Sequence, residues 1–278
     1  MRSSSSNGPA CQNEIVGVSP VIQGVREFAR RVARGDAKVL ITGESGVGKD
    51  MVARYIHQNS ARASRPFVPV NCAGLSETLL ESELFGHVRG SFTGAYRDKV
   101  GRLQLANRGT VLLDEIGEMS LRMQVLLLRF LENGEIHPVG GDGIPTPIDV
   151  RIIGATNRDL GELVRLGQFR EDLLYRIKVV SIHVRPLRDR REDIRPLIEH
   201  LVRRSGRTLR FSDAAMRLLE AHDWPGNVRE LQNVVEQASW LTENDEVGVE
   251  HISLPAAEAT EPAPVPTAAP PADWLLQG

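Results

Sequence analysis

The stretch "KVLITGESGVGKD", from Lys38 to Asp50, decides the fold of this 278-residue chain. An apolar run at Lys38–Thr42 is followed directly by a glycine-rich turn that opens a helical pattern. Gly43 to Asp50 have the GxxxxGK spacing of a phosphate-binding loop, in which backbone N–H groups and a lysine surround a phosphate chain. A glycine-rich turn with a chance lysine is the alternative, and the strand–loop–helix context favours phosphate binding.

The residues of this loop have separate expected tasks. The glycines let the backbone turn its N–H groups inward, and Lys49 brings a charge close to the β- and γ-phosphates. Asp50 stands where a serine or threonine usually follows the lysine, so Mg²⁺ would meet a carboxylate or a water that it holds. We therefore expect nucleotide contacts from Gly43, Glu44, Ser45, Gly46, Val47, Gly48, Lys49 and Asp50.

Short apolar runs alternate with helical patterns on both sides of this loop, which predicts an α/β fold with a parallel sheet. The predicted strands are Lys38–Thr42, Phe67–Asn71, Thr110–Asp114, Val150–Thr156 and Val179–Val184. We expect no strand after Arg190 and a small helical domain instead. The predicted helices are Lys49–Gln58, Glu77–Leu84, Leu121–Leu131, Glu192–Arg204, Ser212–His222 and Val228–Leu241.

Composition narrows the class of protein and its organisation. A net charge of −2 gives no general attraction to nucleic acid or lipid, and no apolar run approaches the roughly 18 residues of a membrane span. Two cysteines cannot form a disulfide framework, so we expect a reducing, cytoplasmic location and no membrane contact. The expected parts are a tail at 1–13, a nucleotide-binding domain at 14–186, a helical domain at 187–253 and a Pro/Ala-rich tail at 254–278.

An acidic pair ends the third predicted strand, in "GTVLLDEIGEM". The carboxyl edge of a parallel sheet is where such sheets bind ligands, so Asp114 is expected to hold Mg²⁺. Glu115 is expected to polarise the water that attacks the γ-phosphate. A solvated acidic pair is the alternative, and the phosphate loop upstream favours catalysis.

Four further polar residues fit a nucleotide site. Asn157 follows the next strand, where it is either a γ-phosphate sensor or an ordinary turn residue. Arg170 and Arg176 lie beyond the sheet edge, where they reach a neighbouring subunit's nucleotide or pair on the surface with Glu171 and Asp172. Asn227 is expected to cap the last helix. Arg229 in the first turn opposes the helix dipole, which indicates that it faces an anion.

A flexible hexapeptide lies within "VRGSFTGAYR", at Val88–Arg97. It has neither helical period nor strand alternation, and it raises one aromatic residue between two glycines. The expected contact residues for a partner are Gly90, Ser91, Phe92, Thr93, Gly94 and Ala95. A floppy linker with a buried phenylalanine is the alternative.

These motifs together resemble the central ATPase module of the bacterial sigma-54-dependent transcription activators, the enhancer-binding proteins of the AAA+ superfamily. The resemblance runs from Ile15 to Ser253 through GESGVGKD, NCAGL, ELFGHVRGSFTGA, GTVLLDEIGEM, ATNRDL, FREDLLYRI, PLRDRREDI and WPGNVRELQN. It implies an AAA+ P-loop NTPase domain of three αβα layers with a parallel sheet, followed by a small all-α helical lid. The hexapeptide is the motif most specific to this family.

The resemblance also implies roles. ATP and Mg²⁺ would be bound by the phosphate loop with Asp114 and Asp50, and Asn71 would contact Glu115 to relay the nucleotide state. Asn157 would be the first sensor, Arg170 and Arg176 arginine fingers acting in trans, and Arg229 the second sensor. The hexapeptide would touch sigma-54 and promoter DNA, and a second mobile loop would fall at 132–149. Assembly into a ring, usually a hexamer, is implied in the same way.

The chain departs from the family pattern in three respects. Ser91 replaces the usual alanine of the hexapeptide, and Asp50 replaces a glutamate. We expect no receiver domain before Ile15 and no helix-turn-helix after Ser253. The chain would then act from solution, through a separate DNA-binding or regulatory partner, or as a fragment or degenerate copy.

Three functions are therefore compared. The first is an ATP-hydrolysing activator that converts the closed promoter complex of sigma-54 RNA polymerase into the open complex, and the motifs favour it. The second is an AAA+ mechanoenzyme of another class, against which the hexapeptide argues. The third is a non-catalytic partner subunit of a full-length activator, against which Lys49, Glu115 and the two arginines argue.

Overall fold

Five parallel strands form the central sheet of the computed structural model, which describes residues 14–141, 145–242 and 245–254. The strands lie in the order β2-β5-β8-β1-β9, and every neighbouring pair is parallel. Their bounds are β1 Val39–Thr42, β2 Phe67–Asn71, β5 Thr110–Asp114, β8 Arg151–Thr156 and β9 Val180–His183. The sequence prediction of a parallel α/β sheet is confirmed for all five strands.

Helices cover both faces of this sheet, which is why its strands read as continuous apolar runs. On one face α1 (Pro20–Ala33) and α2 (Lys49–Gln58) pack on Val39, Ile41 and their neighbours. On the other face, Leu40 and the alternate residues contact a second layer. That layer consists of α3 Glu77–Phe85, α4 Arg102–Leu105, α5 Leu121–Asn133, α6 Leu160–Arg165 and α7 Glu171–Ile177.

Helix α1 was not among the sequence predictions, although its start carries a recognisable signal. The Ser19 side chain accepts a hydrogen bond from the Ile22 N–H, and Pro20 occupies the first helical position. The helix is amphipathic, with Ile22, Ala29 and Ala33 buried against the sheet. It completes the layer next to α2.

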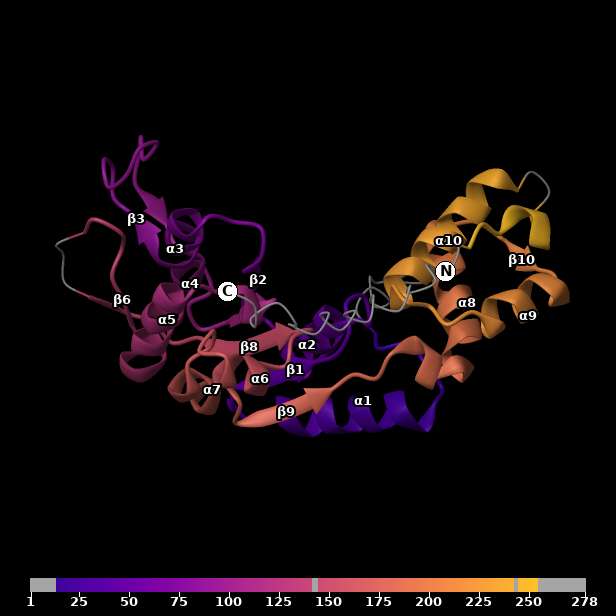
Figure 1. The fold of residues 1–278 in the computed structure, drawn as a ribbon, viewed down its shortest axis with the longest axis horizontal. Helices are drawn as coiled ribbons and strands as arrows, with labels where there is room; N and C mark the ends of the chain where they lie inside the picture. The colour runs from indigo at the N-terminus through magenta and orange to yellow at the C-terminus, as the bar shows by residue number, and fades with distance from the viewer. Residues whose placement is uncertain (1–13, 142–144, 243–244, 255–278) are drawn as a thin grey trace, which may run out of the picture.

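Two short hairpins lie at the end of the molecule opposite the helical domain (Figure 1). β3 (Gly86–His87) pairs with β4 (Lys99–Val100) and carries the hexapeptide between them. β6 (Glu135–Ile136) pairs with β7 (Thr146–Pro147), and a bridge between His87 and Val139 joins the two hairpins. The second loop predicted at 132–149 is thus a hairpin, apart from residues 142–144, which lie outside the described residues.

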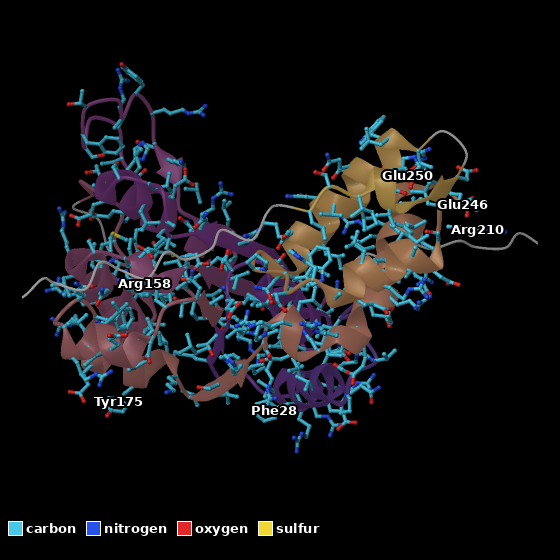
Figure 2. All side chains as sticks on the ribbon, turned by 45° about the vertical axis from the view of Figure 1, so that its right-hand side comes forward. Phe28, Arg158, Tyr175, Arg210, Glu246 and Glu250 are labelled. Carbon is cyan, nitrogen blue, oxygen red and sulfur yellow. The ribbon has the colours of Figure 1, made fainter. Side chains whose placement is uncertain are left out.

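The helical domain after β9, called the lid here, packs three helices around the buried Trp224. They are α8 Ile194–Ser205, α9 Asp213–Ala221 and α10 Asn227–Leu241, preceded by the 3₁₀ turns η2 Leu187–Asp189 and η3 Arg191–Asp193. The predicted helices are confirmed. The expectation of no later strand is wrong, because β10 (Arg210–Phe211) and β11 (Glu246–Val247) pair in parallel at the outer end of the lid (Figure 2).

No helix in the described residues is long and apolar enough to span a bilayer. The tails predicted at 1–13 and 254–278 lie outside the described residues, except for Leu254. Cys72 is buried and unpaired, and burial raises the pKa of its thiol. Cys11 belongs to the part of the chain that is not described.

Candidate functional site

The phosphate loop connects β1 to α2 and depends on glycines with left-handed backbone. Gly43 has φ 151° and Gly46 has φ 77°. A Cβ on Gly43 would lie 2.5 Å from the Val184 carbonyl oxygen, and one on Gly46 would lie 2.3 Å from that of Gly226. The loop is therefore pressed between the end of β9 and the lid, and only glycine fits at these two positions.

Lys49 begins α2 and is almost fully buried in the loop, with 6% of its side chain exposed. Its Nζ donates hydrogen bonds to the carbonyl oxygens of Gly43 (3.0 Å) and Glu44 (3.3 Å). The same ammonium lies 3.5 Å from Glu115 Oε1. The structure thus joins the loop lysine and the acidic pair into one charged cluster.

The acidic pair lies at the carboxyl end of β5, next to the loop. Asp114 Oδ1 accepts a hydrogen bond from the Glu115 N–H at 3.1 Å, and Glu115 has a left-handed backbone with φ 53°. Burial is the main cause that raises the pKa of Asp114, followed by the negative charge of Glu115, with Asp50 adding to the shift. Negative charge is therefore concentrated beside a half-buried carboxyl group.

A magnesium ion would neutralise this concentration of negative charge. Asp50 lies in the first turn of α2 and contributes to the field at Asp114. No group of three or more potential protein ligands is present in the described residues. Two carboxylates fit Mg²⁺ because this ion usually keeps several waters and substrate phosphate oxygens as its other ligands.

Asn71 and Asn157 lie at the same carboxyl edge of the sheet, on either side of the end of β5. The backbone N–H of Asn157, which follows β8, donates to Glu115 Oε2 at 3.2 Å. Asn71 ends β2, and its side-chain oxygen accepts the Ala73 N–H at 2.9 Å. Among the described residues no hydrogen bond joins Asn71 to Glu115, so the expected relay contact is not made in this structure.

The two arginines proposed to act in trans lie around α7, away from the phosphate loop. Arg170 forms two hydrogen bonds with Asp172, and its guanidinium is exposed. Arg176 donates to the Leu131 carbonyl oxygen at 3.3 Å. The structure does not bring either of them to Lys49. The neighbouring Tyr175 is 73% exposed and points outward (Figure 2).

Arg229 and Asn227 approach the phosphate loop from the lid. Arg229 donates to the Ser45 hydroxyl at 2.9 Å, so it faces the loop as its sequence position indicated. The expected helix cap by Asn227 is wrong. Asn227 is the first residue of α10, and its amide instead donates to Glu44 Oε2 and the Ser45 carbonyl oxygen, each at 3.1 Å.

The hexapeptide forms the tip of the β3–β4 hairpin. Gly90 and Gly94 have φ values of 82° and 101°, and a Cβ on either would meet no atom within 4 Å, so their role is backbone freedom. Phe92 is half-buried, and its ring contacts the edge of His87 at 5.0 Å between centroids. The aromatic residue that is fully exposed nearby is Tyr96, at 87%, which the sequence analysis did not single out.

The second hairpin supports the first through the backbone. The Val88 N–H donates to the Val139 carbonyl oxygen at 3.1 Å, and the Val139 N–H donates to Gly86 at 2.9 Å. The imidazole of His87 is positioned by α3, because its Nδ1 lies 2.7 Å from the Ser82 hydroxyl. The hexapeptide is therefore anchored to α3 and to the β6–β7 hairpin.

A phosphate loop after β1, an acidic pair at the end of β5 and a helical lid bound to that loop define a P-loop NTPase of the AAA+ class. The chain belongs to the sigma-54 interaction domain family, whose model matches residues 15–183. A second family model, the AAA+ ATPase lid domain, matches residues 188–269.

Named relatives agree with this assignment. The chain is 53% identical over 244 residues to the Nif-specific regulatory protein of Klebsiella oxytoca, covering 86% of this chain and 46% of that protein. It is 49% identical over 251 residues to the alginate biosynthesis transcriptional regulatory protein AlgB of Pseudomonas aeruginosa, covering 88% and 56%. The chain thus spans about half the length of the relatives it matches.

The solved structures of NtrX from Brucella abortus share the fold. The complex with ADP superposes with a TM-score of 0.79 at 37% identity, covering 87% of this chain and 56% of that one. The complex with ATP gives a TM-score of 0.78 at 38% identity, covering 87% and 57%. The AAA+ α/β domain with its helical lid is therefore confirmed.

Proposed function

We propose that this chain binds and hydrolyses ATP with Mg²⁺ and uses the cycle to remodel the closed promoter complex of sigma-54 RNA polymerase into the open complex. The observation that carries the proposal is the joint presence of a complete phosphate loop with its acidic pair and a glycine-hinged aromatic hairpin. The match to the sigma-54 interaction domain family and the NtrX complexes with ADP and ATP support nucleotide binding. Such work would take place in the bacterial cytoplasm.

In this proposal each residue at the carboxyl edge of the sheet has a separate role in binding or hydrolysing ATP. Lys49 and the surrounding N–H groups bind the phosphates, and Asp114 with Asp50 holds Mg²⁺, which would neutralise charge on the phosphate oxygens. Glu115 accepts a proton from the attacking water, with Asn157 beside it. Asn71 relays the state of Glu115, and Arg229 reports it to the lid. Arg170 and Arg176 complete the site of a neighbouring copy in a ring, six copies by resemblance.

The hexapeptide is the part that acts on the promoter complex. Gly90 and Gly94 act as hinges, and Phe92 with Ser91, Thr93 and Ala95 contacts sigma-54 and promoter DNA. The half-buried position of Phe92 against His87 supports a movable contact, since one aromatic edge contact contributes only about 0.5–1.5 kcal/mol. Nucleotide binding can supply enough free energy to break a contact of this strength.

The direct test is an open-complex assay with sigma-54 polymerase, promoter DNA, ATP and this chain alone. We expect open complexes with the wild type, and none with Phe92→Ala, which should still hydrolyse ATP at a near-normal rate. Trp240→Ala, which removes an 80% exposed aromatic residue from the lid, is the matched control and should support opening. Continued opening by Phe92→Ala would show that the hexapeptide does not act on the promoter complex.

The same assay separates the alternatives. A chain that hydrolyses ATP but fails to bind sigma-54 in an ADP–metal fluoride state would be an AAA+ mechanoenzyme of another class. A chain without ATPase activity at any concentration would be a non-catalytic subunit. Opening that requires an added protein would identify a separate DNA-binding or regulatory partner.

A further inference from the structure

The middle of the phosphate loop is bound by the lid. Asn227 is completely buried, and its amide nitrogen donates to Glu44 Oε2 and to the Ser45 carbonyl oxygen, each at 3.1 Å. Its amide oxygen accepts the Leu187 N–H at 2.8 Å. One side chain thus ties the loop to both η2 and α10 of the lid.

Glu44 has a second partner in the lid. Arg188 of η2 donates to both carboxylate oxygens of Glu44, at 2.8 and 2.5 Å. The hydrogen bond from Arg188 is the main cause that lowers the pKa of Glu44, and the one from Asn227 acts in the same direction. The carboxylate therefore stays ionised, with both oxygens directed at the lid.

The backbone of the phosphate loop also packs closely against the lid. The Arg229 N–H lies 3.3 Å from the Gly46 carbonyl oxygen, and a Cβ on Gly46 would collide with the Gly226 carbonyl oxygen. The loop can therefore change shape at Glu44–Gly46 only if the lid moves with it. The contact extends to Val47, whose carbonyl oxygen accepts a hydrogen bond from the buried Arg190 at 3.0 Å.

We propose that Glu44, Arg188 and Asn227 form a loop–lid latch, which makes the conformation of the phosphate loop and the placement of the lid one equilibrium. Their side chains are positioning groups: the Glu44 carboxylate acts through the lid, while its backbone N–H keeps the place in the phosphate loop that the sequence predicts. The inference rests on the proposed function in one respect, that nucleotide binds at the phosphate loop. Nucleotide then binds tightly only in the fraction of molecules with the latch closed.

The hydrogen bonds that Asn227 makes suggest a variant that tests the latch. Asn227 must donate to two acceptors and accept from one N–H while its backbone is left-handed, with φ 55°. Asn227→Asp keeps size and backbone preference, yet a carboxylate can only accept, and it would face the Glu44 carboxylate. Adding Glu44→Gln should repair the pair in part, since a glutamine amide can donate to the new carboxylate, although Arg188 then keeps a single acceptor at position 44.

The experiment measures lid placement and nucleotide affinity separately. Spin labels are placed on the exposed positions Gln58→Cys and Arg217→Cys in a Cys11→Ser background, with Cys72 protected by burial. Pulsed EPR gives the distance distribution and calorimetry gives the Kd for ADP. We expect Asn227→Asp to broaden the distribution and weaken ADP binding about tenfold, as a closed fraction of roughly one tenth would.

The controls decide the interpretation. Arg191→Ala removes an exposed ion pair with Asp223 on the same lid segment and should change neither measurement. Asn227→Asp with Glu44→Gln should return both measurements toward the wild type. Asn227→Gly, which allows the left-handed backbone without the amide, replaces Asn227→Asp if the latter does not fold.

Three results would overturn the latch. They are an unchanged distance distribution in Asn227→Asp, a broadened distribution with unchanged ADP binding, and no repair even in part by Glu44→Gln. These outcomes are distinct from failure of the proposed function. A wild type that binds ADP but never opens a promoter would refute the function alone, and a wild type that binds no ADP would still allow the distance measurement to test the latch.

Discussion

At the scale of single residues, Asp114 combines a proposed role in magnesium binding with a cost in stability. Its carboxyl group is half-buried, and burial together with Glu115 raises its pKa above the ordinary value. Between the ordinary pKa of about 3.9 and the raised one, the folded state holds a proton that the unfolded state releases. Stability therefore falls as the pH rises through that window.

We predict that Asp114→Asn stabilises the chain at neutral pH while it abolishes ATP hydrolysis. An asparagine oxygen can still accept the Glu115 N–H, but the buried charge is gone. A gain of about 1 kcal/mol would raise Tm by about 2–4 °C at pH 7, measured without Mg²⁺ or nucleotide. The difference from the wild type should vanish below the ordinary pKa, and a constant or negative difference would contradict this account.

At the scale of elements, the site was predictable where its residues belong to one local pattern. The phosphate loop is a single stretch of eight residues, and the acidic pair follows a buried strand, so sequence alone found both. The two-residue strands β3, β6 and β10 have no period to detect. Helix α1 was not predicted although Ser19 and Pro20 mark its start, because its buried stripe is Ile22 with two alanines, a weak apolar pattern.

Contacts between distant elements escaped the sequence for a physical reason. Asn227 and Glu44 are 183 positions apart, and nothing in the neighbourhood of either residue encodes the other. An asparagine after a Pro-Gly turn is typical of a helix cap, and this local reading was wrong because tertiary contacts used the amide instead. The hexapeptide motif was found, and the burial of its phenylalanine, named as an alternative, is partly realised through a contact with His87 that the motif does not encode.

One element junction offers a test of stability. Asp193 is fully buried and accepts hydrogen bonds from the Val18 N–H, the Ser19 N–H and the Ser19 hydroxyl, at 2.6–2.7 Å. Its carboxylate also lies 3.8 Å from the buried Arg190. We predict that Asp193→Ala costs about 3–5 kcal/mol in the free energy of unfolding, because it leaves donors and a charge without a partner.

Urea denaturation of both variants gives the measurement. Asp189→Ala is the matched control, because Asp189 is an exposed acidic residue in the preceding turn of the same segment. It should stay within about 0.5 kcal/mol of the wild type, as surface substitutions usually do. Similar losses for the two variants would show that the Asp193 contacts contribute little.

At the scale of the whole molecule, the arginines around α7 and the phosphate loop lie on different parts of the α/β domain. Arg176→Ala and Glu115→Ala should each bind ATP and fail to hydrolyse it. We predict that mixing the two inactive variants restores part of the ATPase activity. In a mixed ring some interfaces combine an intact Glu115 from one copy with an intact Arg176 from the next.

The measurement is phosphate release as a function of the mixing ratio. Mixing Glu115→Ala with Lys49→Ala is the control, because both changes damage the same nucleotide site and every such site in the ring stays defective. It should restore nothing. Mixtures of Arg176→Ala and Glu115→Ala that remain inactive would show that Arg176 acts within its own copy or has no part in catalysis.

The carboxylate of Asp193, which holds the N-cap residue of α1, has one more consequence. Ser19 and Asp193 are separated by 174 positions, so the helix near the start of the described chain is completed by a residue made much later. Until Asp193 is made, the Val18 and Ser19 N–H groups and the Ser19 hydroxyl have only water as an acceptor. We infer that the order of synthesis and the order of folding differ here, and that α1 is fully anchored only after Asp193 is in place.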